Sequence, residues 1–171
     1  LHWYYGSQRE VRPAQDRQKE PYHGFMTNNF VAPKSVLTAI PFDESITTYG
    51  HEDTLFGLAL KEQGIEVLHL SNPVRHLGLE PAPQWLAKQE VAVANLARIS
   101  TQVPELDTRL LQLWRRLKAL GRLDLPLGFV LEPLTSHLVQ HLTQSREPKL
   151  WMLDLLKLYW LSKQTKGPAK L

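Results

Sequence analysis

Residues 50–53, Gly-His-Glu-Asp, place an imidazole and two adjacent carboxylates directly before a stretch with the apolar spacing of an amphipathic helix. We call these four residues the tetrad. Negative charge at a helix N-terminus is stabilised by about 0.3–1 kcal/mol, because the first N–H groups are unpaired and the macrodipole is positive there. One carboxylate is enough for that role. The second is surplus, and a carboxylate within reach of a hydroxyl can take its proton. Capping and chemistry both stay open at this point.

Other residues that could do chemistry carry weaker signals. His137 and His141 are four apart on one predicted helix face, but no third metal ligand lies near them in the sequence. The order His-Glu-Asp-Thr-Leu is not a zinc-protease helix, since Leu55 stands where the second histidine would be. The chain has no cysteine, which excludes disulfides, thiolate zinc sites and a cysteine nucleophile and fits a reducing, cytoplasmic compartment.

The composition bounds the class of protein. With 171 residues, 43% of them apolar, the chain can bury a core as one domain or as a domain with an appendage. Residues 101–171 hold eleven Lys and Arg against six Asp and Glu, whereas residues 1–100 hold nine against eleven. The basic part carries no recognition-helix or aromatic RNA motif, so no nucleic-acid partner is expected. No run reaches the roughly 18 apolar residues of a membrane span.

The first part of the chain has an α/β pattern. Strands are predicted over 1–8, 25–32 and 65–72, the last with enough Val, Leu and Ile to be buried on both faces. Helices are predicted over 33–40 and from the tetrad to Gly64, a glycine typical of a helix C′ position. Because the chain starts with Leu in an aromatic, strand-like stretch, we expect it to be the later part of a longer polypeptide.

After Pro83 the sequence shows only helical patterns, over 85–99, 104–123, 134–142 and 150–161. This change in pattern predicts two parts. Residues 1–82 form the α/β part, and residues 83–171 form an all-helical C-terminal extension.

The last predicted helix, within residues 149–166, is apolar nearly all round, and two interpretations stay open. It is either buried in a bundle or subunit contact, or it lies on a membrane surface. In the second case Trp151, Tyr159 and Trp160 suit the headgroup boundary, and the lysines nearby suit anionic lipid. The protein would then be peripheral at the inner face of the membrane.

Residues 23–78 resemble the acceptor-side half of family 2 glycosyltransferases, GT-A enzymes that move a sugar from a nucleotide diphosphate. The matching pieces are a strand ending in an Asn and aromatic motif, then Phe-Asp-Glu, then Gly-x-Glu-Asp opening a helix, then a strand leading to a histidine. The resemblance implies that residues 1–82 are the C-terminal portion of a GT-A, Rossmann-like α/β domain, followed by the helical extension.

The resemblance also implies roles for the matching residues. Asp53 takes the place of the general base in an inverting transfer to an acceptor hydroxyl. Glu52 then holds acceptor hydroxyls or orients the loop. Gly50 and His51 are implied to lie in the acceptor site. Asn28 and Asn29 either line that pocket or satisfy backbone groups.

On the donor side the resemblance implies a nucleotide-diphosphate sugar, with Mn²⁺ or Mg²⁺ stabilising the departing diphosphate. His76 stands where the family places a histidine metal ligand, and an ordinary loop histidine is the alternative. The family's Asp-x-Asp metal motif precedes the matched region, and this chain has no Asp-x-Asp. We therefore expect metal and donor to need a preceding part, and this chain alone to be inactive.

The implied acceptor is a carbohydrate or a lipid-linked molecule, as in polysaccharide biosynthesis. The alternative function is a non-catalytic interaction or membrane-docking module derived from a glycosyltransferase. This alternative predicts that the sequence preceding this chain also lacks Asp-x-Asp.

Overall fold

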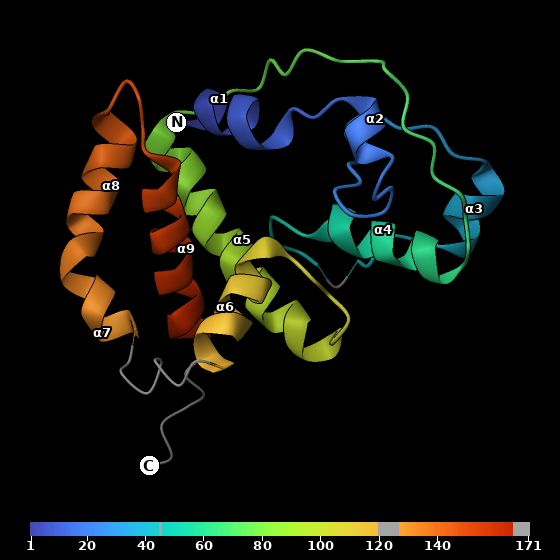
Figure 1. Cartoon of the computed structure of the whole chain (residues 1–171). Coiled ribbons are helices and arrows are strands. Elements are labelled where there is room, and N and C mark those ends of the chain that lie inside the picture. The colour runs from blue at the N-terminus through green and yellow to red at the C-terminus, as the bar shows by residue number, and fades with distance from the viewer. Residues whose placement is uncertain (45, 120–126, 166–171) are drawn as a thin grey trace.

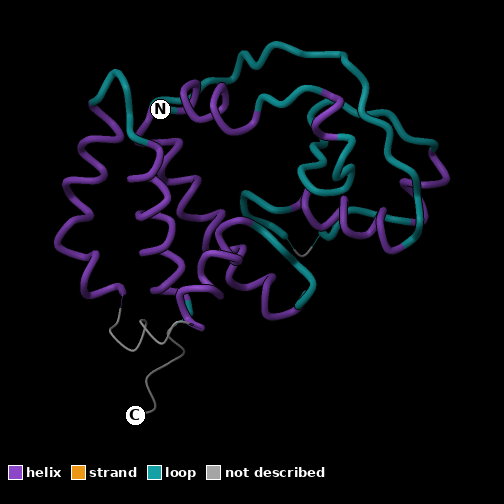
Figure 2. Tube along the Cα trace, in the orientation of Figure 1, coloured by secondary structure: helices purple, strands orange, loops and turns teal. Residues whose placement is uncertain are grey.

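A computed structural model describes residues 1–44, 46–119 and 127–165, and within these ranges it is helical, with no strand or sheet (Figure 2). The prediction of an α/β fold, the C-terminal portion of a GT-A Rossmann-like domain, is therefore wrong for the described residues. The predicted helical extension is helical, and the first part of the chain is made of short helices joined by loops.

Nine α-helices lie in the described residues (Figure 1), with a π-helical turn after the first and a 3-10 turn after the seventh. In chain order they are α1 His2–Tyr5, the π turn Gly6–Glu10, α2 Ala14–Arg17, α3 Lys34–Ala39, α4 Glu52–Glu62, α5 Ala82–Gln102, α6 Arg109–Ala119, α7 Leu127–Leu131, the 3-10 turn Glu132–Leu134, α8 Thr135–Gln144 and α9 Leu150–Gln164. The helix predicted over 104–123 begins later, at Arg109, and its last residues lie outside the described ranges.

Helices α5 to α9 form a bundle around α9, which packs against α5, α6, α7 and α8 (Figure 1). Leu153, Leu156 and Leu161 of α9 are almost completely buried. This helix is apolar nearly all round because neighbours cover several of its sides. Of the two interpretations of this helix, burial in a bundle is what the structure shows, while Trp151 at its start is half exposed.

A second, smaller core holds together residues 14–74, which we call the N-terminal layer. Phe25, Ile40, Phe56 and Leu60 are its buried members. The two cores meet where Leu55 of α4 and Ile46 pack against the bundle. The tetrad spans the end of the loop before α4, with Gly50 and His51, and the first turn of α4, with Glu52 and Asp53.

The segment 65–72 is extended, as a strand would be, but no backbone ladder forms on it. The side-chain amide of Gln18 takes the place of a neighbouring strand. Its Nε2 donates to the Val67 carbonyl at 3.0 Å, and its Oε1 accepts from the His69 N–H at 2.7 Å. The Tyr22 hydroxyl donates to the Ile65 carbonyl at 3.0 Å. The predicted strand is wrong because side chains satisfy the backbone groups that a sheet would have paired.

The other two predicted strands are also wrong, and packing explains both. Residues 1–8 are helical because Tyr5 packs against Trp85 of α5, with ring centroids 4.9 Å apart. That contact overrides the β propensity of the aromatic residues. Residues 25–32 turn back on themselves, since Phe25 and Phe30 both contact Phe56, at 5.6 and 6.1 Å. A straight strand could not bring both rings to one partner.

Helix α4 ends as the sequence predicts, at a left-handed glycine. Gly64 has φ +64°, its N–H donates to the Lys61 carbonyl, and the Ile65 N–H donates to the Leu60 carbonyl at 2.9 Å. This is the Schellman pattern, which satisfies carbonyls left unpaired at the helix end. Ile65 and Leu60 also share the smaller core, so the same turn fixes the start of the extended segment.

Candidate functional site

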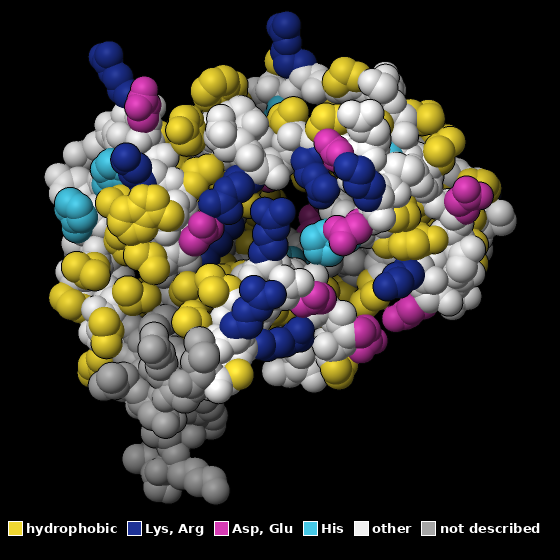
Figure 3. Space-filling view, in the orientation of Figure 1, with side chains coloured by type: hydrophobic (Ala, Val, Ile, Leu, Met, Phe, Trp, Pro, Cys, Tyr) yellow, Lys and Arg dark blue, Asp and Glu magenta, His cyan; other side chains and the backbone are white. Residues whose placement is uncertain are grey.

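A large cleft opens between the bundle and the N-terminal layer, with a volume of about 1190 Å³. The space-filling view shows the surface hollowed here, with Lys and Arg side chains gathered around the hollow (Figure 3). The charged residues that line the cleft are of both signs: Arg9, Arg12, Arg17, Arg109 and Lys157, with Glu10, Glu52, Asp53, Glu66 and Asp154. The volume is slightly larger than the roughly 300–1,000 Å³ that is typical of small-ligand pockets.

The structure brings together six of the seven residues that the sequence predicted for a site. The tetrad lines the cleft, and so do Asn28 and Asn29 from the loop before α3. Asn29 also donates from Nδ2 to the Asn72 carbonyl at 3.0 Å, so this amide does satisfy a backbone group. His76 is the exception, because it is not among the residues that line the cleft.

The two carboxylates of the tetrad are held in different ways in the first turn of α4. Glu52 accepts through Oε2 from the Gly50 N–H at 3.1 Å. Asp53 accepts through Oδ1 from the Thr27 N–H at 3.2 Å and from the Thr27 hydroxyl. These contacts orient Asp53 through one oxygen, and Oδ2 forms no hydrogen bond with any other residue that the structure describes. Both carboxylates also lie where the helix dipole favours negative charge.

The backbone before them takes an uncommon course. Gly50 has φ +107° and His51 has φ +74°, the one non-glycine residue with positive φ in the described part of the chain. Such backbone persists only when its surroundings enforce it, and it is frequent at functional sites. A Cβ built on Gly50 would lie 2.7 Å from the Ala92 Cβ, so only glycine fits against α5 here.

Sequence reasoning missed Asn95 of α5, which contacts this loop. Asn95 is buried, 5% exposed, and its amide donates to backbone carbonyls of the loop, at 3.0 Å to Thr48. The sequence does show that Asn95 is the one polar residue in the run 91–97 of a predicted helix. A buried amide in such a run needs hydrogen-bond partners. That signal does not say where the partners are.

His51 is uncharged at neutral pH. The pKa of its imidazole is lowered to about 4, mainly by burial and also by the charge of Lys157, while a hydrogen bond to the Ala92 backbone opposes both. The neutral ring that donates to Ala92 keeps one nitrogen as an acceptor. A neutral imidazole beside two carboxylates can accept a hydrogen bond from a substrate hydroxyl.

This shift predicts a loss of stability in acid. Because the folded pKa lies below the usual 6.5, the folded state is favoured above pH 6.5, and that advantage is lost as pH falls to 4. The loss is about 3 kcal/mol for a shift of this size. His51→Asn, which tolerates positive φ, should lack this part of the acid limb in urea unfolding between pH 7 and 4. His137→Asn, at an exposed site, should keep it, and equal acid limbs for wild type and His51→Asn would contradict the assignment.

Lys157 of α9 also lines the cleft near the tetrad. Its ammonium lies 4.9 Å from the centroid of the Tyr5 ring, and it forms no ion pair within the described residues, since Asp154 pairs with Arg9 at 2.9 Å. Burial lowers the pKa of Lys157 to about 8, with the charge of Asp154 opposing and that of Arg9 adding to the shift. The folded state therefore holds this charge at a cost.

We expect Lys157→Met to be more stable than wild type at pH 7, by up to about 3 kcal/mol, because the variant buries no ammonium. The cost is fully present below pH 8 and is relieved as pH rises toward 10.5, so wild type should gain stability over that range and the variant should not. Urea unfolding at pH 7 and pH 10 measures both. Lys163→Met, on the same helix but ion-paired with Glu132 at the surface, should change little. Lower stability of Lys157→Met at pH 7 would contradict the expectation.

His76 lies in the exposed segment after residue 72, with its ring 5.1 Å from that of His2 in an edge-on contact. The nitrogen Nδ1 of His2 accepts from the Glu80 N–H, so it faces the backbone. No group of three or more His, Asp or Glu suited to a metal ion exists in the described residues. The described residues therefore do not by themselves fit the Mn²⁺ or Mg²⁺ that the resemblance implies.

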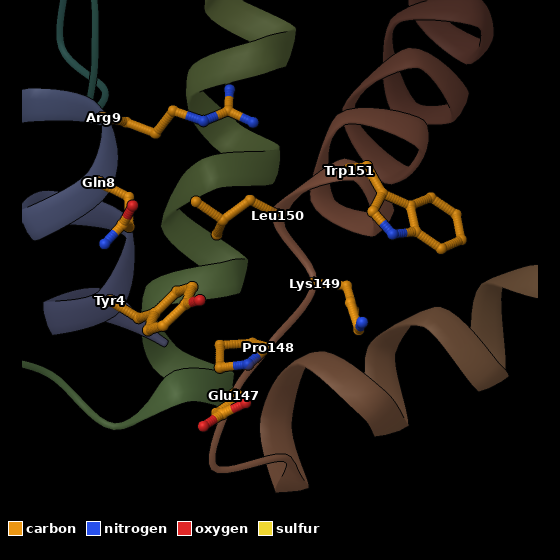
Figure 4. A pocket seen from close by; sticks show the side chains of 8 residues that line it. All are labelled: Tyr4, Gln8, Arg9, Glu147, Pro148, Lys149, Leu150 and Trp151. Atoms are coloured by element: carbon orange, nitrogen blue, oxygen red, sulfur yellow. The ribbon is translucent and has the colours of Figure 1, made fainter.

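A second, shallower pocket of about 330 Å³ lies between the first residues of the chain and the start of α9. Tyr4, Gln8 and Arg9 face Pro148 and Leu150 across it, and Trp151 projects to the outer side (Figure 4). None of the helices among the described residues is both long and apolar enough to cross a membrane. The residues that line this pocket differ in charge from those of the tetrad site. Glu147 is the one carboxylate among them.

Comparison with known proteins gives no relative: no family model, curated protein or solved structure matches the chain.

Proposed function

We propose that this chain carries the acceptor side of a glycosyltransferase, which moves a sugar with inversion from a nucleotide-diphosphate sugar to an acceptor hydroxyl. Asp53 is the general base, and Glu52, His51, Asn28 and Asn29 hold the acceptor. The observation that supports this is the convergence of these residues on one cleft of about 1190 Å³. The resemblance over residues 23–78 supplies the reaction class.

The site, and not the fold, is the basis of this proposal, since the same chemistry recurs on unrelated folds. Asp53 is suited to the role because it lines the cleft, and because Thr27 fixes one carboxylate oxygen while the other forms no hydrogen bond among the described residues. A base must lie within hydrogen-bond reach of the proton it removes, and a carboxylate held at one oxygen meets that requirement without further movement.

The proposed acceptor is a carbohydrate or a lipid-linked molecule. Amide, imidazole and carboxylate groups of the cleft offer donors and acceptors for sugar hydroxyls. A divalent cation, when bound, neutralises the diphosphate that leaves the donor. We place that ion and the nucleotide in a part of the protein other than the residues described, with His76 as the candidate contribution of this chain.

A non-catalytic module that docks to a partner or to the inner face of a membrane is the second candidate. Trp151 supports it, since this large ring is 54% exposed at the start of α9 and stands beside Lys149 and the shallower pocket. An exposed Trp next to a cation is typical of a headgroup boundary.

The test is turnover by the full-length polypeptide with a panel of UDP- and GDP-sugars, Mn²⁺ and mixed carbohydrate and lipid-linked acceptors. Release of the nucleoside diphosphate that depends on acceptor would support the transferase. Folded protein that neither turns over nor binds any sugar nucleotide would reject it. Flotation with anionic liposomes at low salt then tests the docking module, and absence of binding would reject its membrane form.

A further inference from the structure

One face of α5, a helix of the helical extension, contacts the loop in which the tetrad begins. Ala92 and Asn95 are three residues apart on this helix and therefore lie on the same side of it. Both contact the loop 48–51. The predicted boundary at residue 82 thus separates two parts of the chain that together shape the loop in front of α4.

Asn95 makes the more extensive contact. Its Nδ2 lies 3.0 Å from the carbonyl oxygen of Thr48, 3.4 Å from that of Tyr49 and 3.3 Å from that of Gly50. Two N–H groups are thus shared among three consecutive carbonyls. The Oδ1 atom accepts from Nη2 of the exposed Arg98 at 3.3 Å, so both polar atoms of the amide have a partner. The side chain is 5% exposed, so water does not compete for these bonds.

Ala92 completes the contact surface. Its Cβ lies where a side chain on Gly50 would be, and its backbone accepts a hydrogen bond from the His51 ring. The loop is therefore held at three successive carbonyls, at one glycine and at one imidazole. These contacts enforce the positive φ of Gly50 and His51, and that turn directs Glu52 and Asp53 into the cleft.

We propose that Asn95 is a positioning residue of the tetrad site: its amide holds the carbonyls of residues 48–50 so that Glu52 and Asp53 are presented to the cleft. The effect on catalysis rests on the proposed function, whereas the effect on the loop does not. The helical extension is then a part of the site, because the geometry of the tetrad depends on α5.

Asn95→Leu in the full-length polypeptide tests this, since leucine has a similar size and no donor. Arg98→Ala is the matched control, because it removes the partner of Oδ1 and leaves the three carbonyl contacts. Amide hydrogen exchange is measured at residues 50–54 and, as an internal reference, in α9. In Asn95→Leu we expect the exchange rate at residues 50–54 to rise at least about tenfold, while the exchange rate in α9 stays within about twofold of wild type. In Arg98→Ala we expect no rise in the exchange rate of either region.

Turnover supplies the second readout. We expect kcat of Asn95→Leu to fall roughly 10- to 100-fold with acceptor KM changed by less than about threefold, because a displaced base slows the reaction more than it weakens binding. Unchanged exchange at 50–54, or an equal rise in α9, would overturn the proposal. If wild type shows no turnover, the proposed function fails, and the exchange experiment still decides the role of Asn95.

Discussion

Asp53→Asn is expected to lower kcat by about two to four orders of magnitude while the protein stays folded. The variant keeps an oxygen at Oδ1 that can accept from Thr27, so the local hydrogen bonds survive. What it loses is the ability to take a proton from an acceptor hydroxyl. Acceptor-dependent release of nucleoside diphosphate by the full-length polypeptide measures the change, and urea unfolding checks the fold.

The control for this prediction is Glu62→Gln, which neutralises a carboxylate at the other end of the same helix. Glu62 is exposed and does not line the cleft, so the turnover of Glu62→Gln should stay near that of wild type. A near-normal kcat for Asp53→Asn would remove this residue as the base. Asp53 would then be explained by its place in the first turn of α4, where a carboxylate stabilises the helix.

Helices could be predicted from the sequence wherever apolar residues recur at helical spacing over several turns. The apolar spacing after the tetrad, and a glycine at its end, located α4 between the tetrad and Gly64, although the helix starts earlier, inside the tetrad, at Glu52. The same reasoning located α5, α8 and α9. These elements carry their own signal, because a stripe at helical spacing and a capping residue are local features.

The sheet could not be judged in the same way, because a strand depends on a partner. Residues 65–72 were predicted to be a strand buried on both faces, but Leu68 and Leu70 are 69% and 64% exposed, so that prediction is wrong. Gln18 and Tyr22 bond to the backbone of this segment in place of a second strand. An apolar run of this length does not reveal what pairs with it. The α/β prediction failed at this step, and the family resemblance reinforced the error.

The site was partly predictable for a similar reason. Four adjacent residues and an Asn pair were found by type and order, and the structure places all six around one cleft. Asn95 and Lys157 were not found, because each is one of several polar side chains on its helix and no motif singles it out. What marks them is the part of the fold they contact or act on, which is the loop before α4 for Asn95 and His51 for Lys157.

Gly50→Ala tests whether this loop depends on close contact with α5, and we expect it to cost about 2–5 kcal/mol in the free energy of unfolding. A side chain at φ +107° is strained by about 1–2 kcal/mol, and the new Cβ would lie 2.7 Å from the Ala92 Cβ, an overlap that costs a further 1–3 kcal/mol or so. Gly64→Ala is the matched control, because it has positive φ with no atom within 4 Å of the new Cβ. The free energy of unfolding of Gly64→Ala should therefore fall only by the cost of the backbone strain.

A double-mutant cycle separates the two causes at Gly50. Ala92→Gly alone should cost about 1 kcal/mol through helix propensity. Combined with Gly50→Ala it removes the Cβ overlap, though the Ala92 Cα remains 3.1 Å away, so the two substitutions should couple favourably by roughly 1–3 kcal/mol. Additive effects, with Gly50→Ala no worse than Gly64→Ala, would show that the loop does not press against α5. A favourable coupling would tie the conformation of the tetrad to the helical extension, because relief at a helix residue would then restore the loop that carries Glu52 and Asp53.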